Sequence, residues 1–173
     1  MAASNVFVVV RLPIRSSYWA AEGLLAGEYP GSWDARDAAR RLRAFANQDV
    51  TLFVDLTHPA DGLAPYEGLL ESPATRIAHP IVDMGTTTVP HMARILDDID
   101  AALEEERTVY VHCWGGRGRT GTVVGCWLAR HGLDEGDALR RITRLRRDLG
   151  DALSPSPETS AQCAMVTGWK RGN

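Results

Sequence analysis

Short apolar segments alternate along the chain with longer segments in which apolar residues recur at helical spacing. Short apolar runs are typical of buried strands, and a helical repeat indicates the buried face of a helix. The predicted strands are residues 7–10, 24–26, 51–56, 76–81 and 108–112. The predicted helices are residues 34–46, 88–103, 120–131, 134–149 and 158–169.

This alternation predicts an α/β fold. We expect a central, mostly parallel sheet of about four or five strands, with helices on both faces. The 173 residues suit a single domain, with residues 24–173 as its core and residues 1–23 as an N-terminal extension. Functional sites of such sheets lie at the carboxyl ends of the strands, so residues that follow the predicted strands are the first candidates for chemistry.

Composition narrows the classes of function. The formal net charge of −3 disfavours nucleic-acid binding by the chain as a whole. The longest apolar run near the start, Val6–Val10, is too short for a signal peptide or a membrane helix. We therefore expect a cytoplasmic protein with no membrane insertion. Lys170 is the only lysine among the 19 basic residues, and this preference for arginine indicates a GC-rich bacterial genome.

The cysteines suggest free thiols. Cys113, Cys126 and Cys163 are too few for a disulfide framework, and they lack the paired spacing of a zinc site. We expect reduced thiols, with Cys126 and Cys163 in structural roles. A reversible disulfide with Cys113 stays open, because an exposed thiolate oxidises readily. No metal and no cofactor is predicted.

Residues 112–121 are the most informative stretch, His-Cys-Trp-Gly-Gly-Arg-Gly-Arg-Thr-Gly, between a predicted strand and a predicted helix. The glycines let successive backbone N–H groups turn inward into an anion-binding nest, and the helix N-terminus adds positive charge. Arg119 can then bind two oxygens of one phosphoryl group, and Cys113 is favoured as an in-line thiolate nucleophile. The alternative is a buried thiol at a strand end, followed by a tight turn.

The same stretch resembles the signature of the cysteine-dependent protein tyrosine phosphatases, His-Cys-x-x-Gly-x-x-Arg-Ser/Thr, and matches every fixed position. The resemblance implies a three-layer catalytic domain that hydrolyses phosphomonoesters through a phosphocysteine intermediate. It also implies that the phosphate is bound by Trp114, Gly115, Gly116, Arg117, Gly118 and Arg119.

Shorter matches resemble one branch, the atypical dual-specificity phosphatases of the kinase-associated, cyclin-dependent kinase inhibitor-like type. These matches are Leu25–Gly31, Phe53–Thr57, Asp83–Gly85 and Ser156–Thr159. The likeness extends from about Ala26 to Trp169.

Such an enzyme needs a general acid that protonates the leaving oxygen. In the dual-specificity branch this is an aspartate on a loop roughly thirty residues before the cysteine, and Asp83 has that position relative to Cys113. The alternative for Asp83 is a surface turn residue. Other aspartates fit less well, because they lie inside a predicted helix or end a strand: Asp97, Asp98, Asp100 and Asp55.

The resemblance assigns supporting roles to neighbouring residues. His112 would orient the loop and tune the thiolate through hydrogen bonds, and Thr120 would donate a hydrogen bond to the sulfur as the phosphocysteine breaks down. Some related enzymes place a water-positioning glutamine where Gln162 lies, but its place on a predicted helix favours a structural role. Asp55 and His58 lie near the loop edge and are supporting candidates only.

The expected substrate is a phosphorylated protein or a small phosphomonoester, phosphotyrosine first. Phosphoinositides or inositol phosphates are the second class, because Arg117 adds a cation inside the loop. Alternatives for Arg117 are exposure to solvent or a salt bridge to the loop of Asp83 or Asp55. We expect Trp114 to anchor the loop in the core rather than to wall the pocket. Four aromatic residues could line the rim, although the N-terminal core is the more frequent fate: Tyr18, Trp19, Tyr29 and Trp33.

Two alternatives are not enzymes. Five arginines lie on one predicted helix, where they are expected to form a solvated face or to bind an acidic partner: Arg140, Arg141, Arg144, Arg146 and Arg147. A catalytically inactive phosphate-binding module would lack the cysteine, the arginine or the aspartate, and all three are present. The sequence predicts no oligomeric state.

Overall fold

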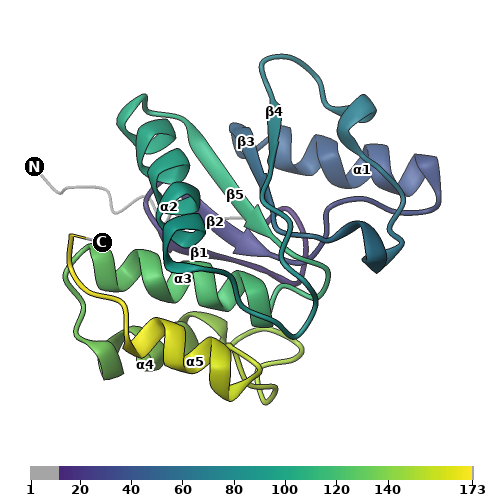
Figure 1. Cartoon of the computed structure of the whole chain (residues 1–173). Coiled ribbons are helices and arrows are strands. Elements are labelled where there is room, and N and C mark those ends of the chain that lie inside the picture. The colour runs from purple at the N-terminus through teal and green to yellow at the C-terminus, as the bar shows by residue number, and fades with distance from the viewer. Residues whose placement is uncertain (1–11, 173) are drawn as a thin grey trace, which may run out of the picture.

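The structure is a computed structural model that describes residues 12–172 (Figure 1). Within these residues the strands are β1 (Ser17–Ala21), β2 (Leu24–Gly27), β3 (Val50–Asp55), β4 (Thr75–Ala78) and β5 (Thr108–His112). The helices are α1 (Ala35–Ala46), α2 (Val89–Glu104), α3 (Gly118–Arg130), α4 (Glu135–Arg146) and α5 (Ser160–Thr167), and Pro59–Asp61 and Glu67–Leu69 form short 3-10 turns. The strand predicted at Phe7–Val10 lies outside the described residues.

The strands form one mixed sheet in the order β1-β2-β5-β3-β4. Only β1 runs antiparallel to its neighbour among the described strands, which confirms the mostly parallel sheet. The apolar pattern does not predict β1, which falls within the stretch 1–23 expected as an extension, so Ser17–Ala21 belongs to the sheet. The missed signal is the hairpin turn at Glu22–Gly23, where Gly23 has a φ of 72° that favours glycine.

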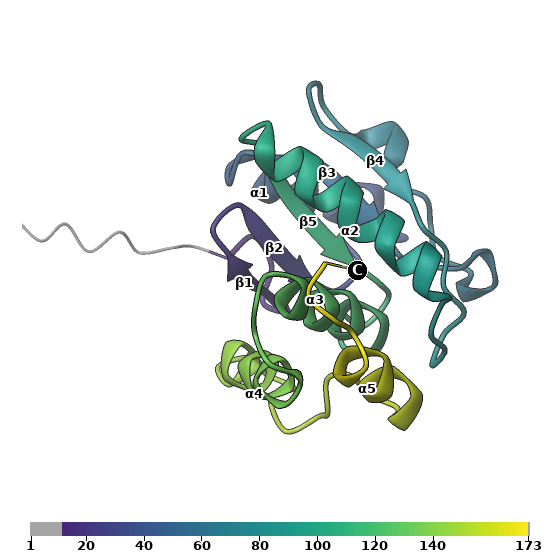
Figure 2. The same cartoon turned by 60° about the vertical axis from the view of Figure 1, so that its left-hand side comes forward.

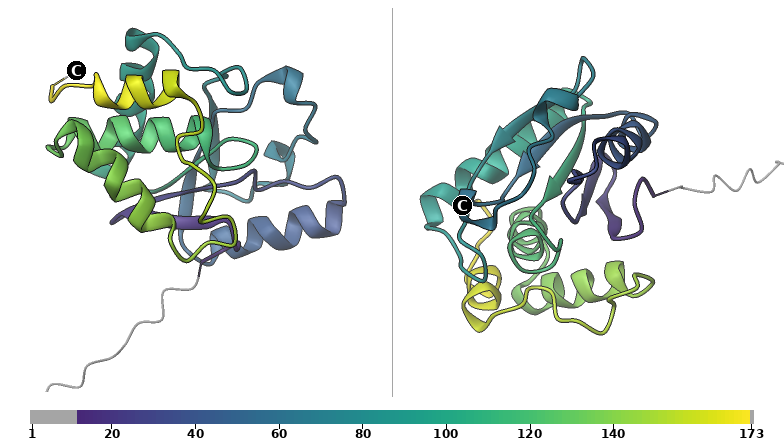
Figure 3. Two further views of the ribbon diagram at one scale, coloured as in Figure 1. Left: turned by 90° about the horizontal axis from the view of Figure 1, so that it is seen from below. Right: turned by 90° about the vertical axis from the view of Figure 1, so that its right-hand side faces the viewer.

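Helices cover both faces of the sheet, which confirms the three-layer fold. α1 lies on one face and α2 and α3 lie on the other, with α4 and α5 packed against α3 (Figures 2 and 3). The larger hydrophobic cluster joins the sheet to α2, α3, α4 and α5. The smaller cluster, beside α1, is rich in aromatic residues: Tyr29, Phe45, Phe53, Tyr66 and Tyr110. No helix in the described part of the chain is both long enough and apolar enough to cross a membrane.

Short polar side chains set the starts of two helices. Asp34 caps α1 by accepting a hydrogen bond from the backbone N–H of Asp37, and Thr88 caps α2 by accepting one from His91. Both predicted starts are confirmed. The boundaries of α5 are tighter than the predicted 158–169, because Thr159 caps this helix in the same way.

Strand register brings three residues side by side at the carboxyl edge of the sheet. His112 at the end of β5 is paired with Gly27 of β2 and with Asp55 of β3. The loop that follows β5, residues 113–117, therefore begins between the loops that follow β2 and β3. The candidate chemistry thus lies at the sheet edge where the topology predicts it.

Candidate active site

The loop of residues 113–117 is held tightly between β2 and α4. Cys113, its first residue, is 3% exposed. Gly116 has a φ of 68°, and a Cβ atom there would collide with the backbone of Gly27, so only glycine fits. Arg146 of α4 donates a hydrogen bond to the carbonyl oxygen of Gly116 at 2.8 Å. The peptide between Gly116 and Arg117 is planar and trans, so the N–H of Arg117 points opposite to this carbonyl group and away from α4.

Arg119, in the first turn of α3, connects the loop to two acidic side chains. Its Nη1 donates to Oδ2 of Asp61 at 2.6 Å and to the carbonyl oxygen of Ile81 at 3.0 Å, and its Nη2 donates to Oδ1 of Asp83 at 2.9 Å. Its buried Nε has no protein partner. Burial disfavours the charged guanidinium, but Asp61, Cys113 and Asp83 outweigh this effect and raise the pKa of Arg119.

Asp83 lies in the turn that follows Ile81, at the guanidinium of Arg119. Its side chain is 49% exposed, so the carboxyl group faces both solvent and Arg119. The backbone turns sharply here, with Met84 at a φ of 58° and a hydrogen bond from Gly85 N to Val82 O. The structure thus brings Asp83 to Arg119, two residues after the cysteine loop, and its role as a general acid stays a prediction.

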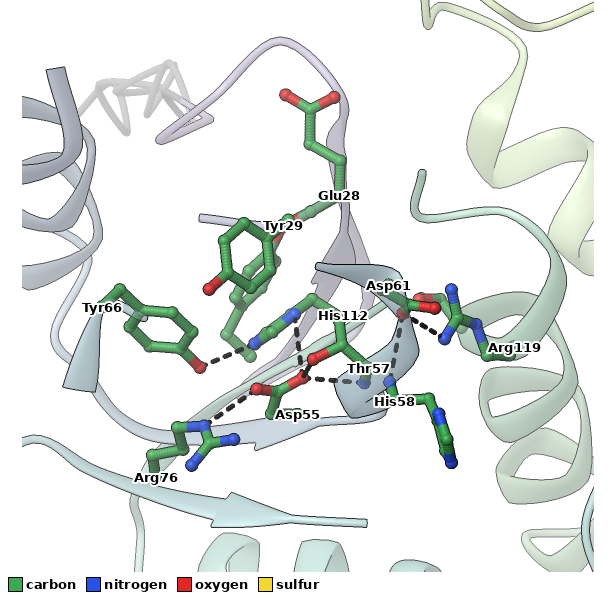
Figure 4. Close-up of polar contacts among 12 residues, drawn as sticks. Glu28, Tyr29, Asp55, Thr57, His58, Asp61, Tyr66, Arg76, His112 and Arg119 are labelled. Carbon is green, nitrogen blue, oxygen red and sulfur yellow. Dashed lines mark hydrogen bonds and ion pairs between the residues drawn. The ribbon is translucent and has the colours of Figure 1, made fainter. Parts of the chain in front are cut away.

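Asp61 is a site residue that the sequence analysis missed. Its side chain is only 5% exposed, and it lies at the end of the 3-10 turn Pro59–Asp61. His58 fixes this turn in two ways. Its ring accepts a hydrogen bond from Ala60 N. Its own backbone N–H donates to the Asp61 carboxylate (Figure 4). A proline just after a capping residue, with an acid two positions later, is the available signal for this turn. His58 therefore supports Asp61.

His112 is fully buried and hydrogen-bonded on one side. Its Nε2 lies 2.7 Å from the hydroxyl oxygen of Tyr66, and its Nδ1 lies 3.8 Å from Oδ1 of Asp55 (Figure 4). Burial lowers the pKa of His112 to about 4, although Asp55 and the backbone of Cys113 oppose the shift. The imidazole is therefore neutral near neutral pH, and its role in orienting the loop stays a prediction.

Asp55 links His112 to the edge strand β4. The backbone N–H and hydroxyl of Thr57 donate to its Oδ1, and Nε of Arg76 donates to its Oδ2 at 2.8 Å. Burial would raise the pKa of Asp55, but His112 and these hydrogen bonds hold it below its usual value. Asp55 is thus an ionised carboxylate beside His112. This agrees with the expectation that Asp55 is a supporting residue and does not react with the substrate.

Thr120 and Gln162 are both completely buried beside the loop. The hydroxyl of Thr120 donates to the carbonyl oxygen of Gly27 at 3.4 Å, and a role at the cysteine sulfur stays a prediction. Gln162 lies on α5, as predicted, where its Oε1 caps the helix start. Its Nε2 donates to the carbonyl oxygen of Gly85 at 2.9 Å, so this side chain ties α5 to the Asp83 turn.

The expected placements of two loop residues need correction. Trp114 is 54% exposed, so the preferred interpretation of a core anchor is wrong, because the chain leaves the sheet after Cys113 and turns this ring outward. Arg117 forms salt bridges with Glu158 at 3.0 Å and Asp151 at 3.9 Å. It therefore pairs with the segment between α4 and α5 and not with the loop of Asp83 or Asp55.

The arginine-rich helix α4 also differs from expectation at one position. Arg146 is 3% exposed rather than solvated, because it turns inward to Gly116, forms a 2.7 Å ion pair with Asp151 and stacks over Tyr18. The other four arginines of the cluster are exposed, as predicted: Arg140, Arg141, Arg144 and Arg147. Of the N-terminal aromatic residues, Tyr18 and Tyr29 are in the core and Trp33 is exposed.

The thiols are free within the described residues. Cys113, Cys126 and Cys163 form no disulfide there. Burial raises the pKa of Cys126 to about 12, which suits a structural thiol. In the described part of the chain, no group of three or more His, Cys, Asp and Glu side chains is arranged to hold a metal ion.

Comparison with known proteins decides the family. The model of the DSP-PTPase phosphatase domain of Swiss Army Knife proteins, PTP-SAK, matches residues 29–166. The chain belongs to this phosphatase domain family. A candidate tyrosine phosphatase of invertebrate iridescent virus 3 is 31% identical over 123 residues, which cover 66% of this chain and 46% of the viral protein.

Solved structures with similar folds agree with this family. Tk-PTP in its active form has a TM-score of 0.73 and 24% identity, over 90% of this chain and 96% of that chain. Kinase associated phosphatase has a TM-score of 0.71 and 17% identity, over 87% of this chain and 90% of that chain. At these identities the likeness shows the fold, which is the predicted dual-specificity phosphatase type.

The chain spans less than half the length of the curated relatives it matches: 46% of the viral protein and 34% of an uncharacterized protein of Methanocaldococcus jannaschii. These relatives are viral and archaeal, and the bacterial origin stays a prediction.

Proposed function

We propose that this domain hydrolyses phosphomonoesters of proteins, with phosphotyrosine preferred, through a phosphocysteine at Cys113. The observation that carries the proposal is the position of Arg119. Its guanidinium, at the start of α3 directly after the cysteine loop, reaches the Asp83 carboxylate at 2.9 Å, which supports placing nucleophile, phosphate-binding group and acid in one site. An inactive phosphate-binding module has no need for this combination.

In the first step, the loop N–H groups and Arg119 bind the phosphoryl oxygens. The Cys113 thiolate attacks phosphorus, the S–P bond forms, and the bond from phosphorus to the ester oxygen breaks. Asp83 donates its proton to the departing oxygen, so that the tyrosine leaves as a neutral phenol. The exposed carboxyl of Asp83 suits this role, because it is accessible to the substrate oxygen.

In the second step, water replaces the thiolate on phosphorus. Asp83, now ionised, accepts a proton from the attacking water, the S–P bond breaks, and phosphate and the Cys113 thiolate are released. Thr120 assists by hydrogen bonding to the departing sulfur. Gln162 keeps the Asp83 turn in place through the carbonyl oxygen of Gly85.

The positive potential at Cys113 comes from groups other than His112. A histidine with a pKa of about 4 carries no charge near neutral pH. Arg119, the inward N–H groups and the N-terminus of α3 therefore supply the electrostatic stabilisation of thiolate and phosphoryl group. This arrangement is strongest when the site excludes water, and Cys113 and Arg119 are 3% and 2% exposed.

Charge pairing favours a phosphoprotein over a phosphoinositide or inositol phosphate. A phosphoinositide or inositol phosphate would need Arg117 to bind its additional phosphates. Arg117 is engaged by Glu158 and Asp151, so recruiting it would leave two carboxylates beside an anionic ligand. Recognition of an acidic partner by the exposed arginines of α4 stays a prediction.

Phosphate release near pH 6 tests the proposal. The substrates are p-nitrophenyl phosphate, free phosphotyrosine, phosphotyrosine and phosphoserine peptides, and phosphoinositides. We expect wild-type activity on aryl phosphates, none in Cys113→Ser, inhibition by vanadate and no loss in EDTA. A wild-type protein that binds phosphate but hydrolyses none of these substrates would refute the proposal and support the inactive module.

A further inference from the structure

Two tryptophans are exposed beside the cysteine loop. Trp33 is 79% exposed and Trp114 is 54% exposed. Aromatic side chains of this size are mostly buried in monomeric proteins, and exposed ones gather at binding surfaces. Both line one pocket of about 480 Å³, together with Tyr29, Leu63 and Gly115. This volume lies within the range of roughly 300–1,000 Å³ found for ligand pockets.

The pocket lies beside the proposed phosphate site, because two of its lining residues directly follow Cys113 in the sequence. Trp114 and Gly115 belong to the cysteine loop and directly follow Cys113. The backbone N–H of Tyr29 donates to the carbonyl oxygen of Trp114 at 2.9 Å, so the loop after β2 is joined to the cysteine loop. An extended peptide advances by about 3.3 Å per residue, so a phosphorylated residue at Cys113 places its neighbours at this pocket.

The base of the pocket is rigid. The hydroxyl of Tyr29 donates to the carbonyl oxygen of Ala64 at 2.5 Å, and its ring packs edge-to-face against Tyr66. These contacts join the loop after β2 to the segment that contains Leu63. A pocket with fixed walls gains affinity because its occupant does not have to order them.

Charge at the pocket argues against a second phosphate. Arg41 is the cation among its lining residues, and it forms ion pairs with Asp37 at 3.2 Å and Glu28 at 3.5 Å. It also donates to the carbonyl oxygen of Tyr29. Glu28 also lines the pocket. A phosphate would have to compete with two carboxylates for Arg41, and a basic side chain would have to compete with Arg41 for Glu28. A neutral apolar side chain meets neither obstacle and buries the tryptophan surfaces.

We infer that the pocket between Trp33 and Trp114 binds a large apolar side chain, aromatic by preference, next to the phosphorylated residue of a protein substrate. This inference rests on the proposed function, and it adds a sequence preference that the catalytic loop alone does not supply. Trp33 acts only on the flanking residue, whereas Trp114 also belongs to the phosphate-binding loop.

The test is a panel of phosphotyrosine peptides that differ only at the residues before and after phosphotyrosine. Each position carries phenylalanine, alanine, glutamate or arginine, and free phosphotyrosine serves as the substrate without flanks. We expect kcat/KM to be about tenfold higher for phenylalanine than for alanine on at least one side. Trp33→Ala should remove this preference and leave hydrolysis of free phosphotyrosine unchanged.

A matched control separates the pocket from general effects of surface truncation. Leu69→Ala also shortens an exposed apolar side chain, which lines a different pocket beside α1, and should keep the phenylalanine preference. Binding of the same peptides to Cys113→Ser should show the same ranking without turnover.

Each remaining outcome gives a clear answer. Equal rates for all flanking residues, with Cys113-dependent hydrolysis of free phosphotyrosine, would overturn the inference and leave the proposed function intact. A preference for glutamate or arginine that Trp33→Ala removes would overturn the apolar class of the occupant. A wild-type protein inactive on free phosphotyrosine and on every peptide would refute the proposed function itself, and the inference with it.

Discussion

Nη1 of Arg119 lies 2.6 Å from Oδ2 of Asp61, and both side chains are almost completely buried. The same carboxylate oxygen accepts a hydrogen bond from the backbone N–H of His58 at 3.1 Å. Asp61 thus fixes one edge of the guanidinium, while Nη2 reaches Asp83 and Nε has no protein partner. We expect a bound phosphoryl group to meet Arg119 at Nε and Nη2, where it would compete with Asp83 for Nη2, and we therefore predict that Asp61 positions the guanidinium for phosphate binding.

Asp61→Asn should separate the charge of this residue from its shape. The amide keeps an acceptor oxygen but loses the charge-assisted hydrogen bond, so we expect kcat/KM for phosphotyrosine to fall about tenfold. Asp61→Ala leaves Arg119 buried without this partner and should lower the free energy of unfolding by about 3–5 kcal/mol. Steady-state kinetics and urea unfolding measure both effects, with the exposed Asp148→Asn as control. Unchanged kcat/KM in folded Asp61→Asn would contradict this role.

The fold was predictable because its signals are local. Apolar runs and capping residues such as Asp34 and Thr88 specify most strands and helices without knowledge of the tertiary structure. β1 was not predictable from such runs, because Ser17–Ala21 has a mixed pattern and depends on pairing with β2. The sequence signal for this strand is the hairpin turn at Glu22–Gly23.

The candidate site was predictable where a contiguous motif or a family resemblance marks it. Cys113 and Arg119 follow from the glycine-rich stretch between a predicted strand and a predicted helix, and Asp83 follows from the resemblance to the dual-specificity phosphatases. Asp61 was missed because it meets Arg119 across 58 positions of sequence. Arg146 was misjudged for the same reason, since helical periodicity does not report which neighbour packs against the last turn of α4. Long-range ion pairs therefore mark the limit of this kind of prediction.

Asp83→Asn should remove general acid catalysis while keeping the fold. The side chain is half exposed, so its replacement costs little packing. We expect kcat for phosphotyrosine peptides to fall about 100-fold or more. The fall should be smaller for p-nitrophenyl phosphate, because p-nitrophenolate leaves readily without a proton. Asp97→Asn on α2 should behave like the wild type, and an unchanged kcat for phosphotyrosine peptides in Asp83→Asn would assign the acid to another residue.

Arg146→Lys should weaken phosphate binding from behind the loop. The two terminal nitrogens of the Arg146 guanidinium donate to the carbonyl oxygen of Gly116 and to the carboxylate of Asp151. The single ammonium group of lysine lacks this forked geometry and cannot hold both acceptors. We expect the inhibition constant of inorganic phosphate to rise about tenfold, in line with the loss of one hydrogen bond. Arg144→Lys changes an exposed arginine of the same helix and is the matched control. Equal inhibition constants for the two variants would show that the contact with Gly116 does not shape the loop.

His112 should make the protein less stable as the pH falls. Its folded-state pKa of about 4 lies below the ordinary value of 6.5, so the unfolded chain binds a proton first. The contribution of neutral His112 to the free energy of unfolding is complete above pH 6.5. It is lost progressively between pH 6.5 and 4, by up to about 3 kcal/mol. Urea unfolding across this range should therefore show that the free energy of unfolding declines as the pH falls. His112→Gln should reduce this decline, whereas His131→Gln, which replaces an exposed ring, should not. A decline of equal size in His112→Gln would mean that other groups, rather than this buried neutral imidazole, set the acid sensitivity of the fold.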